Sequence, residues 1–245
     1  MTARELYQAG RLGEAVQALS AELRDDPGDA KRRTFLFELL CFAGDFDRAD
    51  KQLEILAKDG PNAQMGALLY RAALEAERTR CEIFEKGAKP EEPADGLTSA
   101  VSGQWNGQAF SSIEDADPRI GPRLEVFAAG QYVWLHFADI ASVDIAPPKR
   151  LRDLLWAPAM LNMGPTFRGR PLGEVLLPVL APLSFREEDD AVKLGRVTAW
   201  RQLDSGESVP VGQKILLIDG EEVPFLELRR LEFQNAVASE CHVPA

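Results

Sequence analysis

Apolar residues in the first third of the chain fall at helical spacing. Between residues 36 and 56 they form two stripes separated by Gly44. The first stripe is Leu36, Leu39, Leu40 and Ala43, and the second is Phe46, Ala49, Leu53 and Leu56. Recurrence at three and four residues predicts one buried helix face in each stripe. Gly44 predicts the turn between them, because glycine enters positive φ without a Cβ clash.

The same pattern occurs twice, with residues 6–27 repeating at an offset of 34 residues. Seven positions are identical: Leu6, Ala9, Gly10, Ala15, Leu19, Asp25 and Pro27 recur as Leu40, Ala43, Gly44, Ala49, Leu53, Asp59 and Pro61. This period is typical of tetratricopeptide-like helical hairpins, which bind other proteins. Pro27 and Pro61 are expected where new helices begin, since the first turn tolerates a missing N–H. The alternative is two unrelated hairpins that match by chance.

A third helix is predicted at about residues 63–85, with no glycine and returning helix after it. The array therefore stops after two hairpins and a closing helix. Because fewer than three repeats seldom bury a core alone, we expect the array to dock on the rest of the chain.

A polar segment rich in proline and glycine, residues 86–96, separates two patterns. It divides the chain into a helical-repeat domain (1–86), a linker (87–97) and a second domain (98–245). Short apolar runs broken by Gly and Pro then predict a mostly antiparallel β domain with small helices. The fold class is therefore α+β, with tetratricopeptide-like helical hairpins in front of that domain.

Within the second domain, strands are predicted at 124–128 and 131–137, around a turn at Ala129-Gly130, and at 141–145. Pro148 begins a short helix that ends before Pro158. Residues 174–180 contain Pro178, which indicates an edge or irregular strand. Residues 214–219 and about 223–233 predict a hairpin around Gly220, although Leu228 and Leu231 would also suit a helix.

Charge and composition exclude several classes of function. The net charge is −11, with −3 in residues 1–86 and −8 in the remainder, so a nucleic-acid partner is not expected. The acidic second half favours solubility or a basic or neutral protein partner. No stretch reaches the roughly 18 apolar residues of a membrane span. The first residues do not resemble a signal peptide, and three cysteines suit the reducing cytoplasm.

Residues that could carry chemistry are few. The histidines are His136, inside a predicted strand, and His242, beside Cys241 near the end of the chain. Zinc needs about four spaced ligands, which the chain lacks. Residues 186–190 are charged but without calcium-loop spacing, and Asp115, Asp117 and Arg119 are interpreted as ordinary loop charges. We therefore expect neither catalysis nor a cofactor nor a metal.

Four segments of the second domain stand in a characteristic order. They are Pro118–Val126, Gln131–Phe137, Arg152–Trp156 and Leu194–Trp200. Together with the repeats upstream, they resemble the ImpE family, also called TagJ, over nearly the whole chain. Arg152-Asp-Leu-Leu-Trp and Leu194-Gly-Arg are the more specific parts. Ala199 stands where the family more often has Asp, so no role is given to a carboxylate there.

The resemblance implies an adaptor of bacterial type VI secretion. Such a protein would bind an N-terminal helix of the small contractile-sheath subunit, and would assist the sheath-recycling AAA+ unfoldase. Stacked hairpins suit this role because their surface accepts an amphipathic helix. Two alternatives stay open: a chaperone for a secreted effector, and a metal-dependent hydrolase around Arg168, Arg170 and residues 187–190.

The binding residues follow from the repeat architecture. In arrays of helical hairpins, the first helix of each hairpin commonly lines the concave face of the array. We therefore expect a groove made from the second repeat and the third helix. The residues are Lys31, Thr34, Glu38, Cys41, Met65, Leu68 and Ala72. The alternative is that Met65 and Leu68 pack against the β domain.

Overall fold

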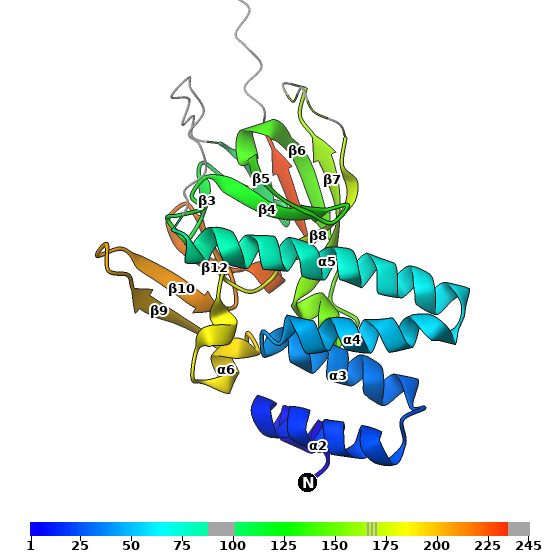
Figure 1. Ribbon diagram of the computed structural model, residues 1–245. Coiled ribbons are helices and arrows are strands. Elements are labelled where there is room, and N and C mark those ends of the chain that lie inside the picture. The colour runs from blue at the N-terminus through cyan, green and yellow to red at the C-terminus, as the bar shows by residue number, and fades with distance from the viewer. Residues whose placement is uncertain (88–100, 166, 168, 170, 235–245) are drawn as a thin grey trace, which may run out of the picture.

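The helices of the first third stack as antiparallel hairpins in the computed structural model (Figure 1). The structure describes residues 1–87, 101–165, 167, 169 and 171–234. The helices are α1 (Ala3–Gln8), α2 (Leu12–Asp25), α3 (Ala30–Phe42), α4 (Phe46–Leu56), the short 3-10 helix η1 (Ala57–Asp59) and α5 (Pro61–Glu85). Both predicted hairpins and the closing helix are confirmed. Except for Gly87, the expected linker lies outside the described residues, as do Arg168, Arg170, Cys241 and His242.

The helix ends show why the repeat has its sequence. Gly10 and Gly44 occupy equivalent turns at φ +78° and +71°, a conformation that strains residues with a Cβ atom. Pro61 begins α5 as predicted. Pro27 does not begin a helix; α3 starts three residues later, where the Asp29 carboxylate accepts a hydrogen bond from the Arg32 N–H. A capping carboxylate therefore fixes this helix start.

The second part of the chain is built from antiparallel strands and short helices, so the α+β prediction is confirmed. The strands are β1 (Gly103–Trp105), β2 (Gln108–Phe110), β3 (Ile113–Asp115), β4 (Arg123–Ala128), β5 (Gln131–His136), β6 (Ile140–Ile145), β7 (Trp156–Met163), β8 (Gly173–Pro178), β9 (Thr198–Gln202), β10 (Ser208–Gly212), β11 (Ile215–Ile218), β12 (Glu221–Pro224) and β13 (Arg230–Phe233). The short helices are η2 (Phe137–Asp139), η3 (Leu151–Leu154), η4 (Ser184–Arg186), α6 (Asp190–Lys193) and η5 (Phe225–Glu227).

Eight of the strands form one sheet in the order β2-β1-β13-β6-β7-β8-β4-β5. A three-stranded sheet, β12-β11-β3, and the β10-β9 hairpin complete the described strands. One face of the large sheet shares a core with the three-stranded sheet, through side chains such as Leu216 and Val223. Helix α5 crosses the other face (Figure 1).

Two predicted strands in this part differ from the structure. The strand around Pro178 is internal, between β7 and β4, and not an edge strand. Pro178 is its last residue and pairs with Trp156 at the end of the ladder. The single strand expected at 223–233 is split: β12 completes the hairpin with β11, η5 turns the chain, and β13 enters the large sheet between β1 and β6.

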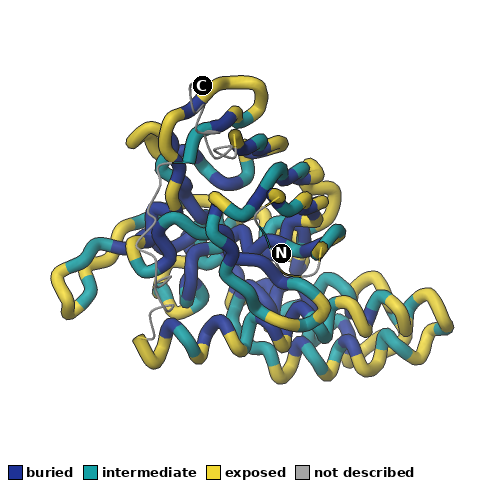
Figure 2. Tube along the Cα trace, turned by 90° about the horizontal axis from the view of Figure 1, so that it is seen from above, coloured by how far each residue is buried: buried dark blue, intermediate teal, exposed yellow. Residues whose placement is uncertain are grey.

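The helical array and the sheet share a hydrophobic core, as expected for an array with two repeats. Phe127, Leu155 and Trp156 pack in the same cluster as the buried residues of α1 to α5. Buried chain continues from the helices into the sheet region, and exposed residues gather at the far ends (Figure 2). The array therefore presents one side to the second domain and keeps the other in solvent.

Candidate partner-binding site

The concave side of the hairpins is partly filled by the chain's own second domain. Trp156, just after η3, stacks on Tyr70 of α5 with ring centroids 6.3 Å apart, and lies 6.5 Å from Phe37 of α3. Its indole N–H donates to the Glu77 carboxylate at 3.1 Å. Arg152 lies over the Tyr70 ring, 4.7 Å from its centroid. The segment from η3 to Trp156 therefore occupies part of the surface where tetratricopeptide-like arrays commonly hold a ligand.

Two of the residues predicted for a partner groove lie beneath this segment. Glu38 is 7% exposed and forms an ion pair with Arg152 at 3.3 Å. Burial raises its pKa, and the Arg152 guanidinium opposes that rise. Cys41 is 4% exposed, and burial raises the pKa of its thiol well above the usual value. A partner would not reach the Cys41 side chain in this conformation.

Lys31, Thr34 and Glu38 instead line a cleft of about 620 Å³ between α1, α3 and residues 148–154. We call it the basic cleft. Lys31 is exposed and Thr34 half-buried at its rim. This cleft is separate from the surface that carries the other predicted residues, so the structure divides the expected single groove into two sites.

The second site begins with an exposed apolar stripe on α5. Met65, Leu68, Leu69 and Ala72 recur at helical spacing, and the first three are 69%, 64% and 52% exposed. The alternative in which Met65 and Leu68 pack against the β domain is therefore wrong. Single exposed apolar residues are ordinary, but a contiguous set on one helix face indicates a contact surface. We call these four residues the apolar stripe.

Beside the stripe lies a cleft of about 660 Å³ between α5 and the face of the large sheet. Leu69 and Ala72 form its helix wall, and residues of β4, β6, β7 and β8 form its floor. Met160 of β7 is 41% exposed and extends the apolar surface. The turn between β4 and β5 closes one side, where a Cβ atom on Gly130 would lie 3.4 Å from the Ala72 Cβ. We call this space the apolar cleft.

Sequence reasoning missed one strand of the floor of the apolar cleft. A helix was predicted from Pro148 to just before Pro158, whereas Trp156–Met163 form β7. Its Ala157, Ala159 and Leu161 are buried and alternate with exposed Pro158 and Met160. That alternation was the available signal for a strand, and Pro158 obscured it.

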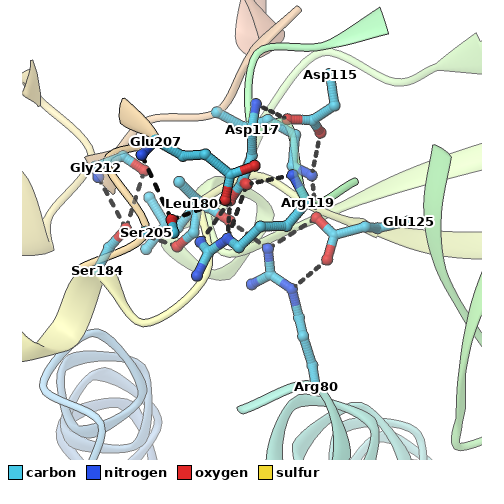
Figure 3. A network of polar contacts seen from close by, with 12 residues as sticks. Arg80, Asp115, Asp117, Arg119, Glu125, Leu180, Ser184, Ser205, Glu207 and Gly212 are labelled. Atoms are coloured by element: carbon cyan, nitrogen blue, oxygen red, sulfur yellow. Dashed lines mark hydrogen bonds and ion pairs between the residues drawn. The ribbon is translucent and has the colours of Figure 1, made fainter. Parts of the chain in front are cut away.

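A buried ionic network fixes α5 on the sheet (Figure 3). Arg80 of α5 donates from Nε to the Glu125 carboxylate at 2.7 Å and from a terminal nitrogen at 2.9 Å. It also donates to the Leu180 carbonyl at 2.9 Å. Lys214 bridges Glu125 to Asp115, with 2.9 Å between Nζ and the Asp115 carboxylate. These four charged side chains are at most 3% exposed.

The network shifts the pKa values of two of its carboxyl groups. Burial opposes the Glu125 charge, but Arg80 and Lys214 outweigh it and lower the pKa of Glu125 to about 2. Burial raises the pKa of Asp115 to about 6, against the attraction of Lys214. The expectation that Asp115, Asp117 and Arg119 are ordinary loop charges is wrong: Asp115 and Asp117 are buried, and Arg119 pairs with Asp117. These groups bond to one another and line neither the basic nor the apolar cleft.

The remaining candidates for chemistry also make structural contacts. Glu187 pairs with Arg201, Asp189 caps α6, and Asp190 accepts a hydrogen bond from the Gly13 N–H. His136 accepts a long hydrogen bond from Arg123 at 3.4 Å, and burial lowers its pKa. Among the described residues, no group of three or more His, Cys, Asp or Glu side chains could hold a metal ion. No helix within the described part is long and apolar enough to cross a membrane.

Two family models match the chain, one in the helical third and one in the second domain. The model described as tetratricopeptide repeat matches residues 6–72, in agreement with the hairpins, and this part of the chain is of the helical-repeat class. The model described as ImpE protein matches residues 107–232, over half of the chain. The chain belongs to the ImpE family.

Individual relatives support this assignment along nearly the full length. The chain is 34% identical to the type VI secretion system accessory component TagJ of Pseudomonas aeruginosa, over 96% of this chain and 92% of the relative. Its fold is similar to the crystal structure of a protein from Vibrio parahaemolyticus, with a TM-score of 0.84 and 26% identity over 96% of this chain and 98% of the other.

Proposed function

We propose that this protein is a non-enzymatic, cytoplasmic adaptor of a type VI secretion system that binds the N-terminal helix of the small contractile-sheath subunit. The observation that carries the proposal is the apolar stripe beside the apolar cleft, in a chain 34% identical to a type VI secretion accessory component. The adaptor would present the sheath subunit to the AAA+ unfoldase during assembly or recycling of the sheath.

The geometry of the stripe suits a helical partner. From Met65 to Ala72 it covers eight residues of α5, about 10 Å along the helix axis. An amphipathic helix that packs on this length would place two or three apolar side chains on the stripe and in the adjoining cleft. Such buried anchors supply most of the affinity in helix-in-groove complexes, and rim charges set orientation.

The ionic network supports the same proposal, because it holds the docking helix in place. Arg80 anchors the later turns of α5 to Glu125, while the earlier turns carry the stripe. A docking surface held rigid before binding loses less conformational entropy when the partner arrives. The partner would therefore meet a preformed surface.

The test is titration calorimetry of the full chain with a synthetic peptide of the N-terminal helix of the cognate small sheath subunit. Leu68→Asp should weaken binding at least about thirtyfold, since it removes a leucine contact and adds a charge to an apolar interface. Its thermal unfolding should change little, because Leu68 is 64% exposed. Ile55→Asp is the matched control: Ile55 is 41% exposed on α4 and lines neither cleft, so the same added charge there should leave binding unchanged.

Two results would argue against the proposal. Equal binding by Leu68→Asp and the unchanged protein would move the site away from the apolar stripe. Absence of binding to the sheath peptide, together with capture of an exported effector, would favour the chaperone alternative.

A further inference from the structure

The basic cleft is chemically distinct from the apolar cleft. Five of its lining side chains are cationic and one is a carboxylate; the cations are Arg4, Lys31, Lys149, Arg150 and Arg152. The carboxylate, Glu38, is already paired with Arg152. The chain has a net charge of −11, so the cleft is a positively charged region on a protein that is negative overall.

Four of the five cations of the cleft form no direct ion pair within the described part of the chain. No carboxylate of the described residues lies within 4.0 Å of the side-chain nitrogens of Arg4, Lys31, Lys149 or Arg150. Asp153 is nearby, but it accepts hydrogen bonds from the backbone N–H groups of Lys149 and Arg150, at 2.8 and 2.9 Å, and is buried. Arg152 also has a buried Nε without a hydrogen-bond partner among the described atoms.

Apolar side chains line the same cleft between the charges. Tyr7 and Phe35 meet edge to face with centroids 5.7 Å apart, and Arg4 lies over the Phe35 ring. Leu151 and Leu154 of η3 contribute to the opposite wall. A ligand that fits must therefore combine negative charge with at least one apolar group.

We propose that the basic cleft binds an acidic peptide segment of a protein partner, through its carboxylates on the cationic rim and an apolar side chain between Phe35 and η3. This site goes beyond the proposed sheath-binding function, because it uses different residues and binds mainly through charged rather than apolar contacts. Its two walls belong to the helical array and to the ImpE-type domain, so the bound segment contacts both.

An acidic peptide suits the cleft better than a nucleic acid. A polyphosphate chain extends beyond a cleft of about 620 Å³ and would meet the negative charge of the remaining surface. A short peptide confines its carboxylates to the cationic rim. Its apolar side chain also buries surface against the aromatic wall of Tyr7 and Phe35.

The experiment measures fluorescence anisotropy of a fluorescein-labelled octapeptide, Glu-Glu-Glu-Leu-Leu-Glu-Glu-Glu, titrated with the full chain. The test variant is Lys31→Glu with Lys149→Glu, which reverses one exposed lysine on each wall. The control variant is Lys51→Glu with Lys58→Glu, which makes the same change of charge at exposed positions of α4 and η1 outside both clefts. Comparator probes are the peptide with Gln in place of Glu, and a single-stranded DNA of twelve nucleotides.

The expected result is saturable binding of the acidic peptide, about tenfold weaker in the test variant and within twofold of the original in the control. Higher salt should weaken it, because the rim charges are solvent-exposed. Leu68→Asp should bind the acidic peptide normally, which separates this proposal from the sheath-binding proposal. The proposal is overturned if the acidic peptide shows no saturable binding, or if the two double variants lose affinity equally. It is also overturned if the DNA binds more tightly than the peptide and the test variant abolishes that DNA binding.

Discussion

Replacing Arg80 by methionine tests how the docking helix is held on the sheet. Arg80 makes two hydrogen bonds to Glu125, one to the Leu180 carbonyl, and one to Glu77 at 3.1 Å. Methionine fills a similar volume without a charge. The variant therefore leaves Glu125, which is fully buried, with Lys214 as its remaining cation, and leaves the Leu180 carbonyl without this donor.

The expected loss of stability follows from these contacts. Removing one partner of a buried ion pair commonly costs about 3–5 kcal/mol, since the other charge stays buried. Lys214 still neutralises part of the Glu125 charge, so we expect about 3 kcal/mol. Against a total of about 5–15 kcal/mol for a folded domain, that is a large fraction.

The assay is urea unfolding monitored by circular dichroism, with the free energy of unfolding extrapolated to water. Arg71→Met is the control: Arg71 pairs with Asp50 at 2.8 Å, but both side chains are 40% exposed, so its loss should cost less than about 1 kcal/mol. The reasoning is refuted if Arg80→Met and Arg71→Met lose similar amounts, or if Arg80→Met unfolds with unchanged midpoint.

Three further substitutions test the stability of the fold. Because Arg80 and Lys214 lower the pKa of Glu125 from 4.5 to about 2, its ionisation stabilises the fold above about pH 4.5, and this contribution is lost as the pH falls towards 2. Unfolding free energies measured from pH 7 to pH 2 should therefore depend less on pH in Glu125→Gln than in the unchanged protein, and parallel curves would contradict this. Gly44→Ala should lower the thermal midpoint, since a Cβ atom there would lie 2.2 Å from the Phe185 ring at φ +71°. Gly66→Ala, in mid-helix with nothing within 4 Å, should instead stabilise the fold by about 0.5–1 kcal/mol, and a loss at Gly66 comparable to that at Gly44 would contradict the local packing.

The helical third was predictable because its information is local. Apolar spacing, Gly44 and Pro61 each act within one or two turns, so the pattern gave the hairpins and the long third helix. Pro27 was misplaced because a side-chain cap at Asp29 decides where α3 begins. Repeat identity locates a hairpin better than it locates a helix end.

The sheet was less predictable because its order depends on contacts distant in sequence. The strand ending at Pro178 is internal because β4, which is distant along the chain, pairs with the edge that β7 leaves open. The ionic network was missed for the same reason. Asp115, Glu125 and Lys214 are ordinary charged residues until the fold buries them against Arg80.

The candidate partner-binding residues were likewise predicted only in part. Met65 and Leu68 were predicted from the repeat architecture, and the structure leaves both exposed. Cys41 and Glu38 are at positions that face a ligand groove in an isolated array. Here the segment from η3 to Trp156 covers them, and sequence alone did not indicate that insertion.

The central claim is that the apolar stripe on α5 receives a helix of the small sheath subunit. Hydrogen–deuterium exchange of the full chain, with and without the intact subunit, tests it most directly. The account predicts new protection in peptides covering residues 61–76 and 156–163, the helix wall and the exposed strand of the apolar cleft. Binding that leaves both segments unchanged and protects another surface, such as the β9–β10 hairpin, would contradict it.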